Sequence, residues 1–297
     1  MSISVKIVTE NRLDKKVVLD NFSGYYSLMD FSVIDNVWKL AVYMRSSRGV
    51  EVTEEDYGYE VSIKIFSNKA DYDLWKRIVY IIKTLTDAEV YNEDDEVIED
   101  ISETYNDKRV NEIMCRDYKM LKVMINYHNG EPVCIPGVFR SAYIGKWLLR
   151  YLDIDNISDK HAAVILHQWF NDLNWETYIC EKEGTNADMK LKENGSEETK
   201  RISVYEYEDW NTDYSYVTPA ELFAIVHKKT GDTVLIEYDN IEKVIPECWE
   251  RIDDRQYAVC PLTPGEFNDF IERARKYDVS SKYKKPFDNV VLRDFMY

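Results

Sequence analysis

The chain has few of the residues on which the best-known site motifs depend. It holds ten glycines and four histidines in 297 residues. The glycines form neither GxGxxG nor GxxxxGK[ST], the loops whose backbone amides bind nucleotide phosphates. The histidines form no HExxH motif and no zinc-type pairing with cysteine. The sequence therefore excludes phosphate loops and zinc sites of known type, and we expect no cofactor and no metal ion.

Cysteine, a secretory leader and long apolar runs are also scarce or absent. Five cysteines stand at positions 115, 134, 180, 248 and 260, an odd number without a CxxC pair, which favours reduced thiols. The first ten residues lack the charged-then-apolar pattern of a signal peptide. No apolar run approaches the ~18 residues that a membrane span needs. We therefore expect a soluble, cytoplasmic protein.

Positive charge is in short supply. The chain has 38 Lys and Arg against 55 Asp and Glu, which gives a formal net charge of −17. Nucleic acids and anionic membranes require clustered basic residues, so the composition disfavours both as partners. An excess of carboxylates attracts cationic partners and speeds their encounter, although it can also serve solubility alone.

Hydrophobic periodicity in the first half predicts a sheet covered by a helix. The runs 2–8, 37–44, 48–54 and 59–66 read as strands of an antiparallel sheet with one exposed face. The next stretch, 69–87, carries an apolar stripe at helical spacing, and we expect it on the apolar face of the sheet. A second helix or a helix–strand unit is predicted over 107–126, and a short helix or strand over 141–152.

The second half repeats this mixture of element types. Helices are predicted over 158–174, with Ile165 in its buried stripe, and over 264–277, where Thr263 and Glu266 form a capping box. The polar stretch 183–200 is predicted to be a mobile loop or a hairpin tip. Strands are predicted over 176–182, 201–208, 222–228, 233–238 and 257–260.

These elements predict an α+β fold in which antiparallel sheets are each covered by amphipathic helices. We divide the chain into an N-terminal half, 1–155, and a C-terminal half, 156–297, with one continuous domain as the alternative. The segments 59–83 and 257–277 both run from a strand into an acidic helix start. This echo suggests two similar halves, but strand-then-helix units also resemble one another for physical reasons alone.

The sequence contains few candidate catalytic residues. The SxxK at 281–284 lacks companion motifs and reads as a polar tail. Cys134 has His128 and His161 as conceivable partners, but a buried inert thiol is the commoner state. The acidic run 93–96 lacks the order of a calcium loop and reads as a solvated loop. No catalytic residue is assigned, and we favour a non-enzymatic role.

One stretch has the composition of a contact surface. Residues 204–217 interleave tyrosines and a tryptophan with carboxylates. Large aromatic side chains give contact area at low entropic cost, and carboxylates complement Lys and Arg. The alternative is a strand whose tyrosines pack inward and whose acids face solvent. The predicted partner-binding residues are Tyr205, Tyr207, Glu208, Trp210, Asp213, Tyr214 and Tyr216.

The chain also resembles a known group of proteins. The segments 59–66 (YEVSIKIF), 71–75 (DYDLW) and 92–94 (NED) are similar to an uncharacterised bacterial family of comparable length, a domain of unknown function. This resemblance implies no catalytic residues. The acidic, Tyr- and Trp-rich, motif-poor composition is also similar to that of immunity proteins that neutralise bacterial toxins.

Three functions remain open at this point. The first is a protein-binding module for a basic partner, either toxin-neutralising or regulatory, and we favour it because of the charge and the aromatic, acidic stretch. The second is a hydrolase with an unrecognised carboxylate site, which would need a deep pocket where several acids converge. The third is a non-catalytic structural component whose charge only maintains solubility.

Overall fold

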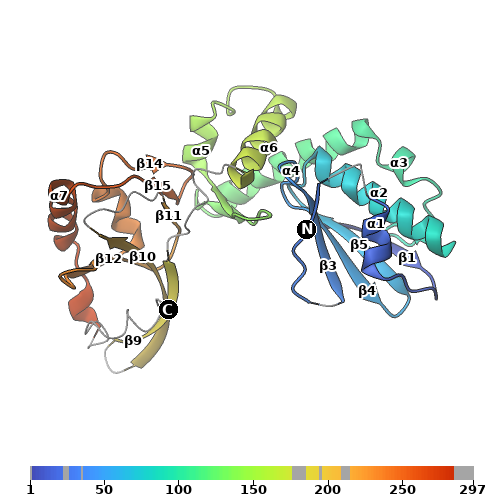
Figure 1. Cartoon of the computed structure of the whole chain (residues 1–297). Helices are drawn as coiled ribbons and strands as arrows, with labels where there is room; N and C mark the ends of the chain where they lie inside the picture. Colours follow the sequence, from blue (N-terminus) through green and yellow to red (C-terminus); the bar gives the residue numbers. More distant parts are fainter. Residues whose placement is uncertain are drawn as a thin grey trace. The chain divides into compact units, whose positions relative to one another are not determined.

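The computed structural model describes residues 2–22, 27–34, 36–175, 185–193, 196–208 and 215–283. The chain divides into two compact units, Met1–Trp175 and Glu176–Tyr297 (Figure 1). Helix α6 (Asp159–Trp175), which the sequence assigns to the second half, packs instead against α4 (Asp107–Tyr127) of the first unit. Lys122 of α4 makes an ion pair of 3.0 Å with Asp159 of α6. The division therefore falls after Trp175 rather than after residue 155.

The first unit is built on a six-stranded sheet in the order β2-β3-β4-β5-β1-β6, and every pair in it is antiparallel. The four strands predicted for this half are all present in it. Gly58 (φ +141°) closes the β4–β5 hairpin, where a Cβ atom would lie 2.0 Å from the Ile7 carbonyl oxygen. The strands are β1 (Ser2–Val8), β2 (Leu28–Asp30), β3 (Val37–Val42), β4 (Val50–Glu55), β5 (Gly58–Lys64) and β6 (Glu89–Tyr91).

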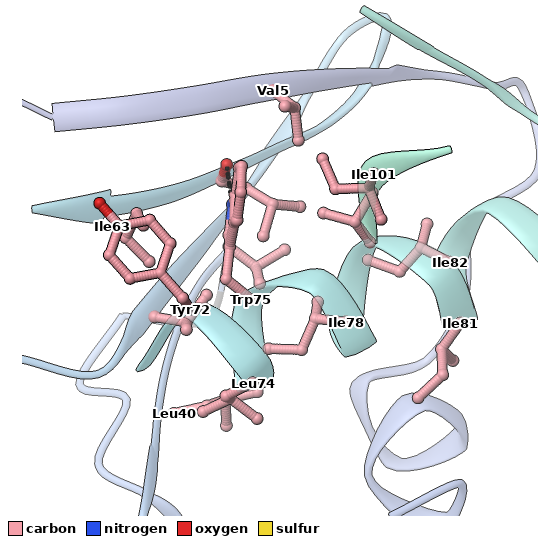
Figure 2. Packing of buried hydrophobic residues seen from close by; sticks show 14 of the residues in the cluster. Val5, Leu40, Ile63, Tyr72, Leu74, Trp75, Ile78, Ile81, Ile82 and Ile101 are labelled. Carbon is pink, nitrogen blue, oxygen red and sulfur yellow. Dashed lines mark hydrogen bonds between the residues drawn. The ribbon is translucent and has the colours of Figure 1, made fainter. Parts of the chain in front are cut away.

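Helix α2 (Lys69–Thr86) covers the apolar face of this sheet, as predicted. The side chains of Trp75, Ile78 and Ile82 are buried, and Figure 2 shows them packed together with Val5 of β1. The Trp75 indole donates a hydrogen bond of 2.9 Å to the Val61 carbonyl, so its polar atom is satisfied within the core. Burying each such side chain stabilises the unit by about 2 kcal/mol.

Helix α6 differs from its predicted burial. Ile165, predicted in the buried stripe, is exposed, whereas His167 is buried against Phe66. The buried face of α6 is set by its contacts with α4 and with the β5–α2 turn, which periodicity alone does not reveal. The other elements are α1 (Lys15–Asp20), α3 (Ile101–Thr104), β7 (Val133–Ile135), β8 (Ala142–Ile144) and α5 (Lys146–Tyr151).

The second unit contains a four-stranded sheet in the order β13-β12-β10-β9. The predicted strands 222–228 and 233–238 form the β12–β13 hairpin. Of the two alternatives for residues 183–200, a mobile loop or a hairpin tip, the structure favours the hairpin, and most of this stretch lies in its arms, β9 and β10. The predicted strand 176–182 lies outside the described residues. The strands are β9 (Thr185–Glu193), β10 (Ser196–Tyr207), β12 (Leu222–His227) and β13 (Thr233–Glu237).

A smaller sheet and one long helix complete the second unit. Helix α7 (Pro264–Arg275) begins with the predicted capping box of Thr263 and Glu266. It buries Phe267 and Phe270 in the core of this unit. The other elements are β11 (Ser215–Val217), η2 (Tyr238–Lys243), β14 (Glu250–Arg251), β15 (Tyr257–Val259) and η3 (Ser280–Lys282), and the sheet order is β11-β15-β14.

The α+β class is confirmed, but the suggested duplication finds no counterpart in the strand order. The sheet of the first unit is antiparallel throughout, whereas β10 and β12 of the second unit pair in parallel. The strand before α2 lies inside a six-stranded sheet, and the strand before α7 lies inside a three-stranded one. The echo in the sequence therefore reflects the similar physics of two strand-then-helix units.

The cysteines correct a second expectation. Cys248 and Cys260 form a disulfide, with Cα atoms 6.2 Å apart. The cause is the β14–β15 register, which pairs Glu250 with Ala258 and so places the residues two positions further out opposite each other. Cys115 and Cys134 are free. The prediction that all five thiols are reduced is therefore wrong for this pair.

Removing the disulfide should weaken the second unit. The bond closes a short loop, and its loss in a Cys248→Ser/Cys260→Ser variant should lower the free energy of unfolding by about 2 kcal/mol. Urea unfolding of the wild type with and without a reductant checks this value. The reductant should reproduce the loss in the wild type and leave the double variant unchanged. A wild-type protein that is insensitive to reductant contradicts the disulfide.

Candidate functional site: an acidic groove at the end of helix α2

The aromatic residues of the predicted contact stretch lie in the core of the second unit where the structure describes them. The exposed fractions of Tyr205, Tyr207 and Tyr216 are 7%, 2% and 3%. Tyr207 stacks on Phe267 of α7 with ring centroids 4.0 Å apart, and burial raises the pKa of Tyr205. Tyr205 and Tyr207 therefore pack β10 against α7, and none of the three tyrosines forms part of a surface. Trp210, Asp213 and Tyr214 lie outside the described residues.

The two acids next to these tyrosines differ in exposure. Glu208, which follows the end of β10, is exposed, and its carboxylate lies 3.1 Å from the ammonium of Lys228. Glu206 is partly buried and pairs with the same lysine at 2.9 Å. Of the four predicted contact residues that the structure describes, only Glu208 has an exposed side chain, and its carboxylate is already paired with a cation of its own unit.

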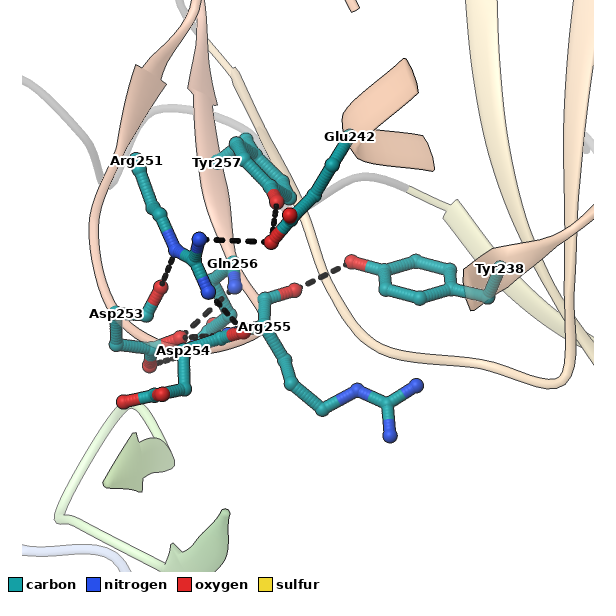
Figure 3. Close-up of polar contacts among 8 residues, drawn as sticks. All are labelled: Tyr238, Glu242, Arg251, Asp253, Asp254, Arg255, Gln256 and Tyr257. Atoms are coloured by element: carbon teal, nitrogen blue, oxygen red, sulfur yellow. Dashed lines mark hydrogen bonds and ion pairs between the residues drawn. The ribbon is translucent and has the colours of Figure 1, made fainter. Parts of the chain in front are cut away.

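A dense polar network in the second unit closes the β14–β15 turn (Figure 3). Asp253 is buried, and its carboxylate accepts hydrogen bonds of 2.8 Å from the backbone amides of Arg255 and Gln256. Arg251 donates to the Asp253 carbonyl at 2.9 Å and pairs with Glu242 at 2.7 Å. The Asp253 carboxylate and the Arg251 guanidinium thus bind the turn and its flanking strands, so we interpret this network as structural support for the hairpin.

The buried carboxylate of Asp71 has a similar structural part in the first unit. It accepts hydrogen bonds from the backbone amides of Ser47, Arg48 and Gly49 at 3.2, 3.0 and 2.8 Å. It also accepts one of 3.0 Å from Asn68, the N-cap of α2. One carboxylate therefore ties the β3–β4 turn to the start of α2 and is saturated by that task.

Two further titratable groups are buried beside Phe66. Asp117 accepts a hydrogen bond of 3.1 Å from the Phe66 amide, and the imidazole of His167 stacks on the Phe66 ring at 5.3 Å. Phe66 itself has φ +63°, an unusual backbone conformation for a bulky residue. Burial lowers the pKa of His167 to about 4 and raises that of Asp117. Neither side chain lines a hollow described below.

Metal-binding geometry is not found among the described residues. In that part of the chain no group of three or more His, Cys, Asp or Glu side chains converges as metal ligands would. His161 is exposed and His167 is buried, so the two histidines of α6 point into different surroundings. The acidic run 93–96 is exposed, and Lys6 pairs with Asp95 of that run at 2.6 Å.

A groove of about 400 Å³ lies where α2 ends. Its walls come from the last turns of α2, from β6 and from the loop that leads into α3. The floor is apolar, because the buried side chains of Val79, Val90 and Ile98 line it. Lys83 reaches across one wall and donates a hydrogen bond of 2.6 Å to the Glu99 carbonyl, which fixes the loop against the helix.

The rim of this groove is acidic. Residues 87–107 contain ten Asp and Glu and no Lys or Arg. Asp87 and Glu99 line the groove with exposed side chains, and neither makes an ion pair within the described part of the chain. Asp87 ends α2 in the left-handed conformation (φ 51°), which turns the chain back into β6. The exposed ring of Tyr80 completes the rim. We refer to this hollow as the acidic groove.

Part of the acidic groove could be recognised in the sequence. The density of acids after residue 87 is visible in the sequence, but the absence of motif order favours a solvated loop. What the sequence does not reveal is that Val90, Ile98 and Ile101 return to the end of α2 and enclose an apolar floor between the acids. That enclosure depends on β6 pairing with β1, a contact between residues far apart in the chain.

Comparisons with known proteins do not assign a function to this groove. The chain matches no known protein family, no curated protein and no solved structure. No helix within the described residues combines the length and the apolar character needed to cross a bilayer. The candidate site therefore rests on the shape and charge of the acidic groove.

Proposed function

We propose that this protein is a binding module for a basic partner protein, with a toxin-neutralising or regulatory role in the cytoplasm. The acidic groove would receive a partner segment that carries both apolar and cationic side chains. The observation that supports this most is the combination of a buried apolar floor with the exposed rim carboxylates of Asp87 and Glu99, which have no ion pair with any described residue. The chain-wide charge of −17 would speed the encounter with such a partner.

The chemistry of the groove defines the expected ligand. An aliphatic side chain that lies in the groove over Val79, Val90 and Ile98 would lose part of its contact with water. Lysine or arginine side chains next to it can then reach Asp87 and Glu99. An amphipathic helix presents its apolar and cationic side chains in this way. A carboxylate-rich ligand would be repelled by the same rim.

The alternative of a carboxylate-based hydrolase has less support. Asp71, Asp117 and Asp253 are the buried carboxylates among the described residues. Each accepts hydrogen bonds from backbone amides at a turn or helix start. None of the three lines the acidic groove. Their arrangement fits structural anchoring better than acid–base chemistry on a substrate.

A synthetic basic peptide should bind in the groove, and groove variants should weaken it. The probe is a labelled helical peptide with leucines along one face and lysines elsewhere, followed by fluorescence anisotropy. Asp87→Asn with Glu99→Gln removes two rim charges and should raise Kd roughly fivefold. Asparagine tolerates the left-handed conformation at position 87, so the helix end is kept. Thr84→Trp, at an exposed position lining the groove, should fill it and raise Kd at least roughly tenfold.

The control variants make the same kinds of substitution at exposed positions of the second unit. Glu247→Gln with Asp269→Asn removes two exposed charges, and Asn268→Trp adds an exposed indole on α7. Both should leave Kd within about twofold of the wild-type value. Equal weakening by the groove and control variants would show that the probe responds to net charge alone and would contradict the proposed site.

A further inference from the structure

A second hollow in the first unit has the opposite charge. It lies between α4 and α6, has a volume of about 750 Å³, and is distinct from the acidic groove. Four cationic side chains line it against one carboxylate, that of Glu112. Such a local excess of positive charge stands out in a chain whose net charge is −17. The four cations are Lys108, Arg116, Lys119 and Lys160.

The positive charge of this hollow is only weakly balanced within the protein. Lys108 and Lys160 are exposed and make no ion pair with any described residue. Lys119 lies 3.7 Å from Asp159, a long contact for an ion pair. Asp159 also pairs with Lys122 at the shorter distance of 3.0 Å, so its negative charge is divided between the two lysines.

Arg116 and Glu112, the other charged residues that line the hollow, also leave its positive charge weakly balanced. Arg116 lies 3.9 Å from Asp117, whose carboxylate already accepts a hydrogen bond from the Phe66 amide. Glu112, the one carboxylate lining the hollow, lies 3.6 Å from Arg109, which is not among the lining residues. Both acids are therefore shared with other donors. Of the four cations that line the hollow, Arg116 and Lys119 have only long contacts with an acid, and Lys108 and Lys160 have no ion pair with a described residue.

We propose that this hollow binds a small anion that carries a pyrophosphate group, either free pyrophosphate or the diphosphate of a nucleotide. Several cations around one hollow suit a ligand with several negative charges, and guanidinium and ammonium groups are the usual partners of phosphate oxygens. The volume lies within the range of small-molecule sites and leaves room for an attached organic group. A long polynucleotide would meet the negative field of the whole chain, whereas a small ligand meets mainly the local charges. This site is independent of the acidic groove.

Calorimetric titration of the full chain at low ionic strength tests this site. The ligands are inorganic phosphate, pyrophosphate and ADP. Pyrophosphate should bind more tightly than phosphate, because more of its oxygens reach cations. Lys108→Gln with Lys160→Gln should weaken pyrophosphate at least roughly tenfold. Lys16→Gln with Lys276→Gln, which removes two exposed lysines elsewhere, should change the affinity less than about twofold.

Among the described residues, the free cysteines Cys115 and Cys134 provide a second readout on the same protein. Cys115 lines the hollow and is partly exposed, whereas Cys134 is exposed and does not line it. Saturating pyrophosphate should slow the alkylation of Cys115 and leave that of Cys134 unchanged, as peptide mass spectrometry can measure. An affinity for ADP above that for pyrophosphate assigns the site to a nucleotide, and equal affinities assign it to the free anion.

Three results would overturn the proposal. The first is the absence of pyrophosphate binding to the wild-type chain at low ionic strength. The second is equal weakening by the hollow and control variants, which would reduce the effect to net charge. The third is unchanged alkylation of Cys115 at saturating pyrophosphate, which would place the bound anion elsewhere.

Discussion

Asp71→Ala should lower the free energy of unfolding of the first unit by about 4 kcal/mol. Four backbone amides, those of Ser47, Arg48, Gly49 and Asn68, lose their acceptor in this variant. The side chain is fully buried, so water cannot replace the carboxylate without opening the turn. Urea unfolding followed by tryptophan fluorescence measures the effect, and five of the seven tryptophans belong to this unit.

The control for this variant lies two residues further along α2. Asp73 is partly exposed and pairs with Lys76 at 3.1 Å across one helical turn. Asp73→Ala should cost no more than about 0.5 kcal/mol. A loss below about 1 kcal/mol for Asp71→Ala would contradict the structural part assigned to Asp71, because an uncompensated buried set of four donors cannot be that inexpensive.

His167 should make the first unit sensitive to mild acid. Burial lowers its pKa from the ordinary 6.5 to about 4 in the folded state. Between these two values the unfolded chain binds a proton that the folded chain does not, so stability is complete above about pH 6.5 and falls as the pH is lowered toward 4. The expected loss from this group is about 3 kcal/mol between pH 7 and pH 4.

Two histidine variants separate the contribution of His167 to the pH dependence of stability from that of the many carboxylates. His167→Gln removes the titrating group and should flatten the fall in stability between pH 6.5 and 4. His161→Gln, at an exposed position of the same helix, should leave the wild-type pH dependence unchanged. The measurement is urea unfolding at a series of pH values. Parallel curves for the wild type and His167→Gln would mean that His167 does not control acid stability.

Local signals in the sequence were enough to place the main helices and most strands. The apolar stripe of α2 and the Thr263–Glu266 capping box of α7 arise from residues a few positions apart, so they can be read directly. The strand predicted over 59–66 likewise corresponds to β5, in which Val61 and Ile63 are buried. Each of these predictions depends only on neighbours along the chain.

Contacts between distant segments could not be predicted in this way. The burial of His167 follows from the turn that carries Phe66, and the parallel pairing of β10 with β12 depends on the connection between them. The alternation of tyrosines and acids in β10 did not reveal whether the tyrosines face the core or a partner. The packing of Tyr207 on Phe267 shows that Tyr207 faces the core. The acidic groove needed the return of the chain to the end of α2.

Zero-length coupling of probe lysines to carboxylates tests the central proposal most directly. A carbodiimide joins a lysine of the basic peptide to whichever acid it touches, and peptide mass spectrometry identifies that acid among the 55 of the chain. We expect the coupled residues to concentrate on Asp87, Glu99 and Asp100 around the groove, and Thr84→Trp to remove them. Coupling spread evenly over both units, or confined to acids outside the groove, would contradict the proposal that this groove receives a basic partner.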